Sequence, residues 1–471
     1  MHGRDKTGTD QQVYEKATIS KQSTEEMQIY NSCHYRDGHD ERAIMTALVL
    51  DAHLKSSLAA IRSLGMRGVS IVAGSHRRTA MGLFSRYVQD TFTYPQPLCD
   101  QRGFVEAVIE KSKAIGKPVV LAFSDASLLP LVRQRHCTGD HWIYLSPGNA
   151  SHFEIPFDKA RTLELAQKIG VEIPNTFFST DKAGLTRCLH AITYPAVVKP
   201  RRSVSWTGNV GTHSTAVYAL SAEDLERKCA EVVARTQEFP LVQEYVRGEE
   251  ACVEFLCDRG KILAACAHRR IRSLCPSGGP SVVKQTVPLS YCGINQRAER
   301  LLAELHWSGP IMVEFKIDRR SGIPKLMEIN GRFWGSLPLA IAAGVDFPGL
   351  YYRLACGEHI EPSTEYAAGI VSRHFLADCR NLLWALFKND PIRPFAYPSR
   401  LQAVKEFLIS PAHCLADIRD PRDMAPVFAE IVDIVARLTP KTLVPRALTG
   451  GAEPNSVIRT TREAADTVLT K

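Results

Sequence analysis

The sequence predicts a multidomain protein of the mixed α/β (α+β) class, on the strength of three observations. Between residues 43 and 145, apolar strand-like runs alternate with helical patterns, which is the rhythm of an open parallel sheet. From about residue 241 to 330, period-two runs joined by short turns indicate antiparallel strands. The chain has 471 residues, which is more than one compact domain usually contains.

The first two predicted segments are a tail and a Rossmann-like domain. Residues 1–42 are polar and lack aliphatic periodicity, so we expect them to form a disordered tail. Residues 43–150 begin with the strand "AIMTALVLDA", the helix "LKSSLAAIRSLGMRG" and the strand "VSIVAG". A second helix, "FVEAVIEKSKAIGK", precedes the strand "PVVLAFSDA". These elements predict an α/β domain with a parallel sheet.

Residues 151–360 predict a larger domain with two α+β parts. A helix begins after Asp158, whose side chain can cap the first turn. The buried strand "PAVVK" ends at Lys199 and leads into a loop rich in Gly, Ser and Thr. The segment "GPIMVEFKIDRRSGIPKLMEIN" predicts a β-hairpin with its turn at "RRSG". Residues 361–471 predict a helical C-terminal extension that could serve as a lid, a partner-docking element or a homodimer surface.

Composition excludes several classes of function. The net charge is +8, and Lys and Arg are not interleaved with aromatic residues, so we expect no nucleic-acid partner. The 13 cysteines include no CxxC pair and no metal spacing, which indicates reduced thiols. Neither a signal peptide nor an apolar run of membrane-spanning length is found, so we expect a cytoplasmic protein without a membrane partner.

The strongest chemical signal is the alternation of Glu328, Asn330 and Arg332 on an apolar strand. Residues two apart on a strand share a face, and burying such a set is costly unless a charged group lies opposite. Across the predicted hairpin, Glu314 can lie beside Glu328. Two adjacent carboxylates and an amide suit Mg²⁺, with Mn²⁺ as the alternative, and Mg²⁺ usually completes its shell with substrate phosphates. This set predicts a nucleotide triphosphate as the ligand.

A phosphate site also needs positive charge. Lys199, at the end of its buried strand, is a candidate, and Lys159, in the first turn of a helix, is a second whose alternative is an ordinary surface role. The segment "VQEYVRGEE" offers an apolar edge for a base and a carboxylate for a ribose. Glu250 is the favoured ribose ligand, and Glu249 is the alternative.

The ordered set of Lys159, Lys199 with its loop, "VQEYVRGEE", Glu314 and "MEINGR" resembles the ATP-grasp superfamily, in particular its carboxylate–amine ligase and carbamoyl-phosphate-synthetase-like branches. The resemblance covers residues 43–360 and implies an ATP-grasp fold preceded by a pre-ATP-grasp domain. It implies phosphate or adenine contacts for the two lysines, and Mg²⁺ coordination by Glu314, Glu328 and Asn330. It also implies that Gln243, Glu244 and Val246 line an adenine pocket. Glu250 would bind the ribose, and Arg332 would contact the γ-phosphate.

The reaction that this resemblance implies is activation of a carboxylate by ATP as an acyl phosphate, followed by attack of an amine. The segment "AHRRIRSLCPSGGPS" is the candidate for recognising the carboxylate, with Arg270 as its main contact, although an exposed basic strand is the alternative. Other ATP-dependent reactions remain open, namely a carboxylase-like reaction, acid–thiol ligation and a small-molecule kinase. A non-catalytic nucleotide-binding protein is a further alternative.

Overall fold

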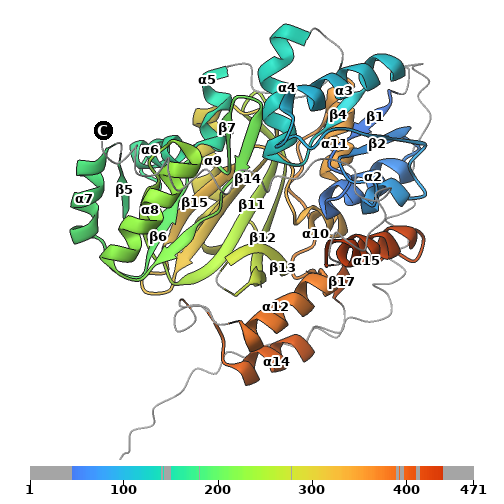
Figure 1. Ribbon diagram of the computed structural model, residues 1–471. Helices are drawn as coiled ribbons and strands as arrows, with labels where there is room; N and C mark the ends of the chain where they lie inside the picture. The colour runs from blue at the N-terminus through green and yellow to red at the C-terminus, as the bar shows by residue number, and fades with distance from the viewer. Residues whose placement is uncertain are drawn as a thin grey trace, which may run out of the picture. The chain divides into compact units, whose positions relative to one another are not determined.

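The computed structural model describes residues 45–138, 142, 150–179, 181–276, 278–388, 392, 397–409 and 414–438. The predicted tail lies outside these residues, as does the end of the chain from 439. Figure 1 shows the order of the helices and strands along the chain. Among the described helices, none is both long enough and apolar enough to cross a membrane.

The first sheet is parallel, as the alternation of strands and helices predicts. Its strand order is β3–β2–β1–β4, and the paired residues run in the same direction throughout. The strands are β1 (Ala47–Val49), β2 (Ile71–Ser75), β3 (Asp90–Thr93) and β4 (Val119–Leu121), and the helices α2 (Lys55–Met66), α3 (Gln101–Ile115) and α4 (Asp125–Thr138) follow β1, β3 and β4. The edge strand β3 was not predicted, because its sequence "DTFT" is mostly exposed and carries no apolar run.

A second, smaller sheet has the order β5–β10–β6–β9 and packs two helices against an apolar core of its own. Its strands are β5 (Thr176–Phe178), β6 (Ala196–Lys199), β9 (Val217–Ala219) and β10 (Leu241–Glu244). The two helices are α7 (Lys182–Ala191) and α8 (Ala222–Thr236), whereas α6 (Lys159–Lys168) packs in the main core. Strand β7 (Val204–Thr207) pairs with β8 (Val210–His213) as a separate hairpin. Asp158 caps α6 as predicted, since its carboxylate accepts hydrogen bonds from the backbone N–H groups of Ala160 and Arg161.

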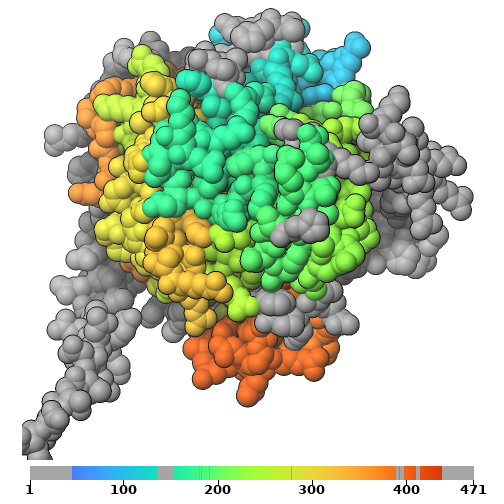
Figure 2. Space-filling model, turned by 90° about the vertical axis from the view of Figure 1, so that its left-hand side faces the viewer, coloured from blue at the N-terminus to red at the C-terminus, as the bar shows by residue number. Residues whose placement is uncertain are grey.

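The largest sheet has seven strands in the order β15–β14–β11–β12–β13–β16–β17. Its first five strands form antiparallel pairs along the chain from Gly248 to Asn330. They are β11 (Gly248–Asp258), β12 (Lys261–Cys275), β13 (Gly278–Val287), β14 (Gly309–Asp318) and β15 (Pro324–Asn330), with α9 (Ile294–Leu305) between β13 and β14. Figure 2 shows the face of the molecule on which the segment carrying α6 to α8 lies in front, with part of the C-terminal extension below it.

The C-terminal extension is helical but also completes the large sheet. Strand β16 (Val371–Arg373) pairs with β13, and β17 (Leu415–Ala416) pairs with β16. Its helices are α12 (Phe375–Phe387), α14 (Arg400–Leu408) and α15 (Ala425–Leu438), and they come after α10 (Leu337–Ala342) and α11 (Phe347–Ala355). The two short strands were not predicted, because two or three residues carry no readable period.

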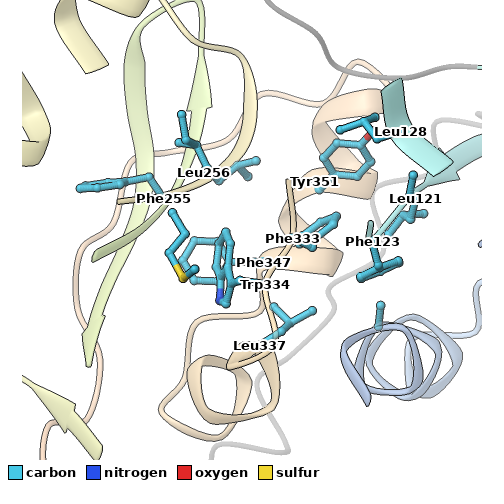
Figure 3. Packing of buried hydrophobic residues seen from close by; sticks show 14 of the residues in the cluster. Leu121, Phe123, Leu128, Phe255, Leu256, Phe333, Trp334, Leu337, Phe347 and Tyr351 are labelled. Atoms are coloured by element: carbon cyan, nitrogen blue, oxygen red, sulfur yellow. The ribbon is translucent and has the colours of Figure 1, made fainter. Parts of the chain in front are cut away.

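The main hydrophobic core joins the first sheet to the large sheet (Figure 3). Phe333, which directly follows Arg332, stacks on Phe123 with ring centroids 5.1 Å apart. Trp334 packs edge-on against Phe347 at 5.0 Å, and the hydroxyl of Tyr351 donates a hydrogen bond to the Val120 carbonyl oxygen. The chain that leaves β15 is therefore anchored in a core shared with the first sheet.

The tip of the β7–β8 hairpin is attached to the start of α3. The Asn209 carbonyl accepts a hydrogen bond from the Gln101 N–H (3.2 Å), and its side-chain oxygen accepts one from the Arg102 N–H (2.8 Å). Its side-chain nitrogen donates to Asp100, the residue that caps α3 (2.9 Å). The loop that follows Lys199 is thus held by the backbone donors at the N-terminus of α3.

Candidate active site

Two carboxylates lie side by side on the edge of the large sheet. Glu314 on β14 pairs directly with Glu328 on β15, as the hairpin prediction expects. Asn330 lies next to both and donates hydrogen bonds from its amide nitrogen to Glu314 (2.9 Å) and Glu328 (3.4 Å). The side chains of Glu314 and Glu328 are 18% and 31% exposed, so the pair is sheltered but open to a ligand.

The electrostatics of the pair distinguish its two members. Burial, together with the neighbouring Glu328, raises the pKa of Glu314 to about 7. Burial alone would also raise the pKa of Glu328, yet Lys159 and Lys199 hold it below its usual value. The ammonium group of Lys159 lies 3.5 Å from Glu328. A cation bound beside the pair would favour the charged form of Glu314.

The donor set fits a hard divalent ion with few protein ligands. Within the described ranges, no group of three or more His, Cys, Asp or Glu side chains is placed to hold a metal. The set at this edge of the sheet is instead two carboxylates and an amide, whose oxygen would face an ion beside the pair once the Asn330 amide turns over from its present hydrogen bonds. Two carboxylates and an amide oxygen are the oxygen chemistry of Mg²⁺ when phosphates complete its shell. Glu314, Glu328 and Asn330 are therefore the residues that would hold it.

Both predicted lysines lie close to the pair. Lys159, the first residue of α6, donates a hydrogen bond to the Ser203 hydroxyl (3.0 Å). Lys199, the last residue of β6, has its ammonium 3.7 Å from the sulfur of Met327 on β15. Burial lowers the pKa of Lys199 to about 8, and Lys159 contributes to the same shift. The small sheet thus brings two cationic side chains over the acidic edge of the large one.

Arg332 is held between the acidic edge and the first domain. Its Nε donates to Asp125 (2.6 Å), and one terminal nitrogen donates to the Asn330 side-chain oxygen (3.1 Å). Burial opposes its charge, but Asp125 raises the pKa of Arg332 above its usual value. Gly331 is required before it, because a Cβ at this position would lie 2.6 Å from the Trp307 ring. Arg332 is therefore a fixed cation beside the carboxylate pair.

The predicted base-binding segment lies at the end of β10, and two of its side chains have partners within the protein. The Gln243 amide donates to the Thr176 hydroxyl (2.8 Å) and is almost fully buried. The Glu244 carboxylate contacts Lys325 (2.5 Å). Val246 is buried as well. The adenine contacts of Gln243 and of the backbone of Glu244 and Val246 stay predictions.

Glu250 and Arg270 form an ion pair across β11 and β12. Arg270 also reaches Glu314 (3.4 Å) and the Gly279 carbonyl oxygen (2.9 Å). Lys316 lies 3.7 Å from Glu250. The predicted ribose ligand and the predicted carboxylate-binding arginine are thus neighbours, and Arg270 connects both to the carboxylate pair.

Asp125 is the functional residue that sequence reasoning missed. It is the first residue of α4, where an acidic side chain has an ordinary explanation in the helix dipole. Its partner Arg332 is 207 residues away in the chain, and no local pattern links them. The only available signal was its position after the strand β4, at the carboxyl edge where open α/β sheets bind ligands.

Comparison with protein families and curated relatives gives a consistent result. Residues 236–374 match the family described as ATP-grasp in the biosynthetic pathway with Ter operon. The chain is 23% identical over 240 residues to the carbamoyl phosphate synthase large chain of Saccharolobus islandicus. That match covers 47% of this chain and 21% of the relative, so the chain spans about a fifth of the length of the curated relatives it matches.

Solved structures share the fold at low sequence identity. The biotin carboxylase domain of Hydrogenobacter thermophilus 2-oxoglutarate carboxylase, a dimer in complex with MgADP, ADP and bicarbonate, has a TM-score of 0.56 and 16% identity, and the match covers 71% of this chain and 75% of that one. N5-carboxyaminoimidazole synthetase from Staphylococcus aureus has a TM-score of 0.53 and 14% identity, with 74% and 86% covered. These structures establish the fold that the sequence motifs predicted.

Proposed function

We propose that this chain, whose residues 236–374 match an ATP-grasp family, is an ATP-dependent ligase that activates a carboxylate as an acyl phosphate and couples it to an amine. The observation that supports this proposal is the convergence of the Glu314–Glu328 pair, two lysines and Arg332 at one sheet edge. Only a ligand with several negative charges and a bound cation balances such a set. We also propose the domain boundaries that the sequence predicts, at about residues 43, 151 and 361, and a homodimer.

In the first step, a carboxylate oxygen of the substrate attacks the γ-phosphorus of ATP, the bond to the β,γ-bridging oxygen breaks, and ADP leaves. Lys159 and Lys199 are placed to hold the phosphates, and Arg332 to orient the γ-phosphate. Asp125 keeps the Arg332 fork in position. Mg²⁺ held by Glu314, Glu328 and Asn330 would supply neutralisation of the phosphate charge.

In the second step, the amine nitrogen attacks the acyl carbon, phosphate leaves with the bonding electrons, and the nitrogen loses a proton. Phosphate makes a good leaving group of what was a carboxylate oxygen, which is why ATP is needed. Arg270, beside Glu314, is placed to neutralise the acyl phosphate. Most of the rate comes from positioning and charge neutralisation, because the protein contributes no covalent chemistry.

The test measures ADP release and hydroxamate formation with hydroxylamine in place of the amine, across a panel of amino acids and small dicarboxylates with MgATP. We expect release of ADP, not AMP, together with hydroxamate. Glu328→Gln should abolish both products while thermal unfolding is unchanged, and Glu304→Gln, an exposed position on α9, should leave them intact. Normal ADP production by Glu328→Gln would show that the metal assignment is wrong.

Bicarbonate is the alternative first substrate. One structure that shares the fold is a biotin carboxylase domain with bound MgADP and bicarbonate. ADP release that depends on bicarbonate, without hydroxamate from any added acid, would favour this carboxylase-like function over the ligase. Nucleotide binding with no ADP release under either condition would instead favour a binding protein.

A further inference from the structure

A cavity of about 920 Å³ lies where the ends of β11, β12 and β14 meet the C-terminal extension. Its sheet wall includes Arg247, Arg269 and Arg319, and its other wall includes Asn381, Tyr397 and Glu406. The volume lies near the top of the range of about 300–1,000 Å³ for small-molecule sites. The cavity therefore has room for a ligand larger than one amino acid.

The wall formed by the extension is fixed. Arg272 on β12 makes a two-pronged ion pair with Asp378 of α12, at 2.8 Å for both prongs, and also donates to the Glu406 carbonyl oxygen (3.0 Å). Asp378 is fully buried. The Asn381 amide donates to the Ser273 carbonyl oxygen (2.7 Å). A ligand would thus meet a preformed cavity, which lowers the entropy cost of binding.

The cavity is predominantly basic. Six of its lining residues are Arg or Lys and three are Glu. Arg247 and Arg319 are exposed and adjacent, because the Arg319 N–H donates to the Arg247 carbonyl oxygen (2.8 Å). Such a pair attracts a carboxylate or a phosphate. Tyr291 and Tyr397 add aromatic surface that can pack against the body of a ligand.

The cavity borders the candidate active site through Arg270. Glu250, Arg270 and Lys316 belong to its lining, and Arg270 also reaches Glu314. An extended ligand can therefore place one end beside the carboxylate pair and the other beside Arg247 and Arg319.

We propose that this cavity binds the acid substrate, and that this acid is an extended molecule with at least two anionic groups. One carboxylate lies near Arg270, where it is activated, and a second anionic group, carboxylate or phosphate, lies at Arg247 and Arg319. The inference rests on the proposed ligase function for the role of the first carboxylate. It adds the size and charge of the substrate, and it assigns the C-terminal extension to substrate recognition.

The test is calorimetric titration of dipeptide pairs, with Mg²⁺ and a non-hydrolysable ATP analogue present and ionic strength fixed. Glu-Glu and Gln-Gln differ only in side-chain charge, and phosphoserine-serine and Ser-Ser differ only in the phosphate. We expect the charged member of at least one pair to bind at least tenfold more tightly, and the pair that discriminates identifies carboxylate or phosphate as the second group.

The double variant Arg247→Gln/Arg319→Gln should lose most of this discrimination. The control Arg259→Gln should keep it, because Arg259 lies in the β11–β12 turn, at the other end of these strands. Equal or absent binding of the charged and uncharged members, or unchanged discrimination in the double variant, would overturn the proposal. Because this readout needs no turnover, charge-dependent binding without ADP release would refute the ligase function and leave the cavity assignment standing.

Discussion

Asp417→Asn should destabilise the protein more than any single substitution on its surface. Asp417 follows β17 and accepts from two lysines of distant segments, Lys284 on β13 (2.6 and 2.8 Å) and Lys55 on α2 (2.6 Å). The side chains of Asp417 and Lys284 are fully buried. Burial alone would raise the pKa of Asp417, but the two lysines hold it well below its usual value.

The expected loss is about 3–5 kcal/mol at pH 7, which is typical when one partner of a buried ion pair is removed. Lys284 limits the loss because it can release its proton, which costs about 4.6 kcal/mol at pH 7 for a lysine of ordinary pKa about 10.4. In the intact protein, burial already lowers the pKa of Lys284 to about 8. The unfolded chain therefore binds more protons between pH 8 and 10.5, and the contribution of Lys284 to stability rises with pH across that window.

The assay is equilibrium urea unfolding followed by tryptophan fluorescence, at pH 7 and at pH 9.5. The loss in Asp417→Asn should be smaller at the higher pH, because Lys284 is then neutral in both proteins. Lys284→Met added to Asp417→Asn should restore at least half of the loss, since it removes the unpaired charge. Asp258→Asn is the matched control, because it breaks an exposed pair with Arg259, worth about 0.5 kcal/mol or less. A wild-type urea midpoint for Asp417→Asn, or no recovery in the double variant, would refute the reasoning.

Three further predictions concern the nucleotide site. Lys199→Ala should raise the KM for ATP ten- to a hundredfold, which corresponds to about 1.5–3 kcal/mol of lost binding free energy. In the wild type, the KM for ATP should also rise above pH 8, because Lys199 loses its proton there. In Lys199→Arg, the KM for ATP should stay level over the same pH range. An unchanged ATP titration would remove Lys199 from the site. Asp125→Asn should lower kcat about tenfold with little change in the KM for ATP, because it removes a contact of Arg332 and not of the nucleotide. A raised KM for ATP with an unchanged kcat in steady-state kinetics would contradict this. Asn209→Ala should speed hydrogen exchange in residues 204–213, and unchanged exchange would show that the hairpin is held by other contacts.

The chemistry of the candidate site could be predicted where it depends on patterns among residues that are close in the sequence. Glu314 and Glu328 lie side by side as the hairpin predicted, but their direct pairing depends on a β-bulge between Glu314 and Phe315, which the alternation of residues does not reveal. Asp158 was recognised as a cap because capping depends on a few adjacent residues.

The remainder depends on contacts between distant segments, which no local pattern records. Lys55, Lys284 and Asp417 each look like ordinary charged residues in the sequence, and only the folded chain brings them together. The pairing of Glu250 with Arg270 depends on the register of β11 against β12, which the sequence does not state. The hydrogen bond that the Gln243 amide donates to Thr176 likewise depends on the pairing of β10 with β5.

The attachment of Asn209 ties two motions into one. If the hairpin after Lys199 lifts to admit or release a nucleotide, it must uncover the first amides of α3, and those amides then need water or another acceptor. Any other acceptor that binds the first amides of α3 would therefore make it easier for the β7–β8 hairpin to lift. For a protein with the proposed function, entry of the nucleotide and exposure of the N-terminus of α3 would therefore be coupled.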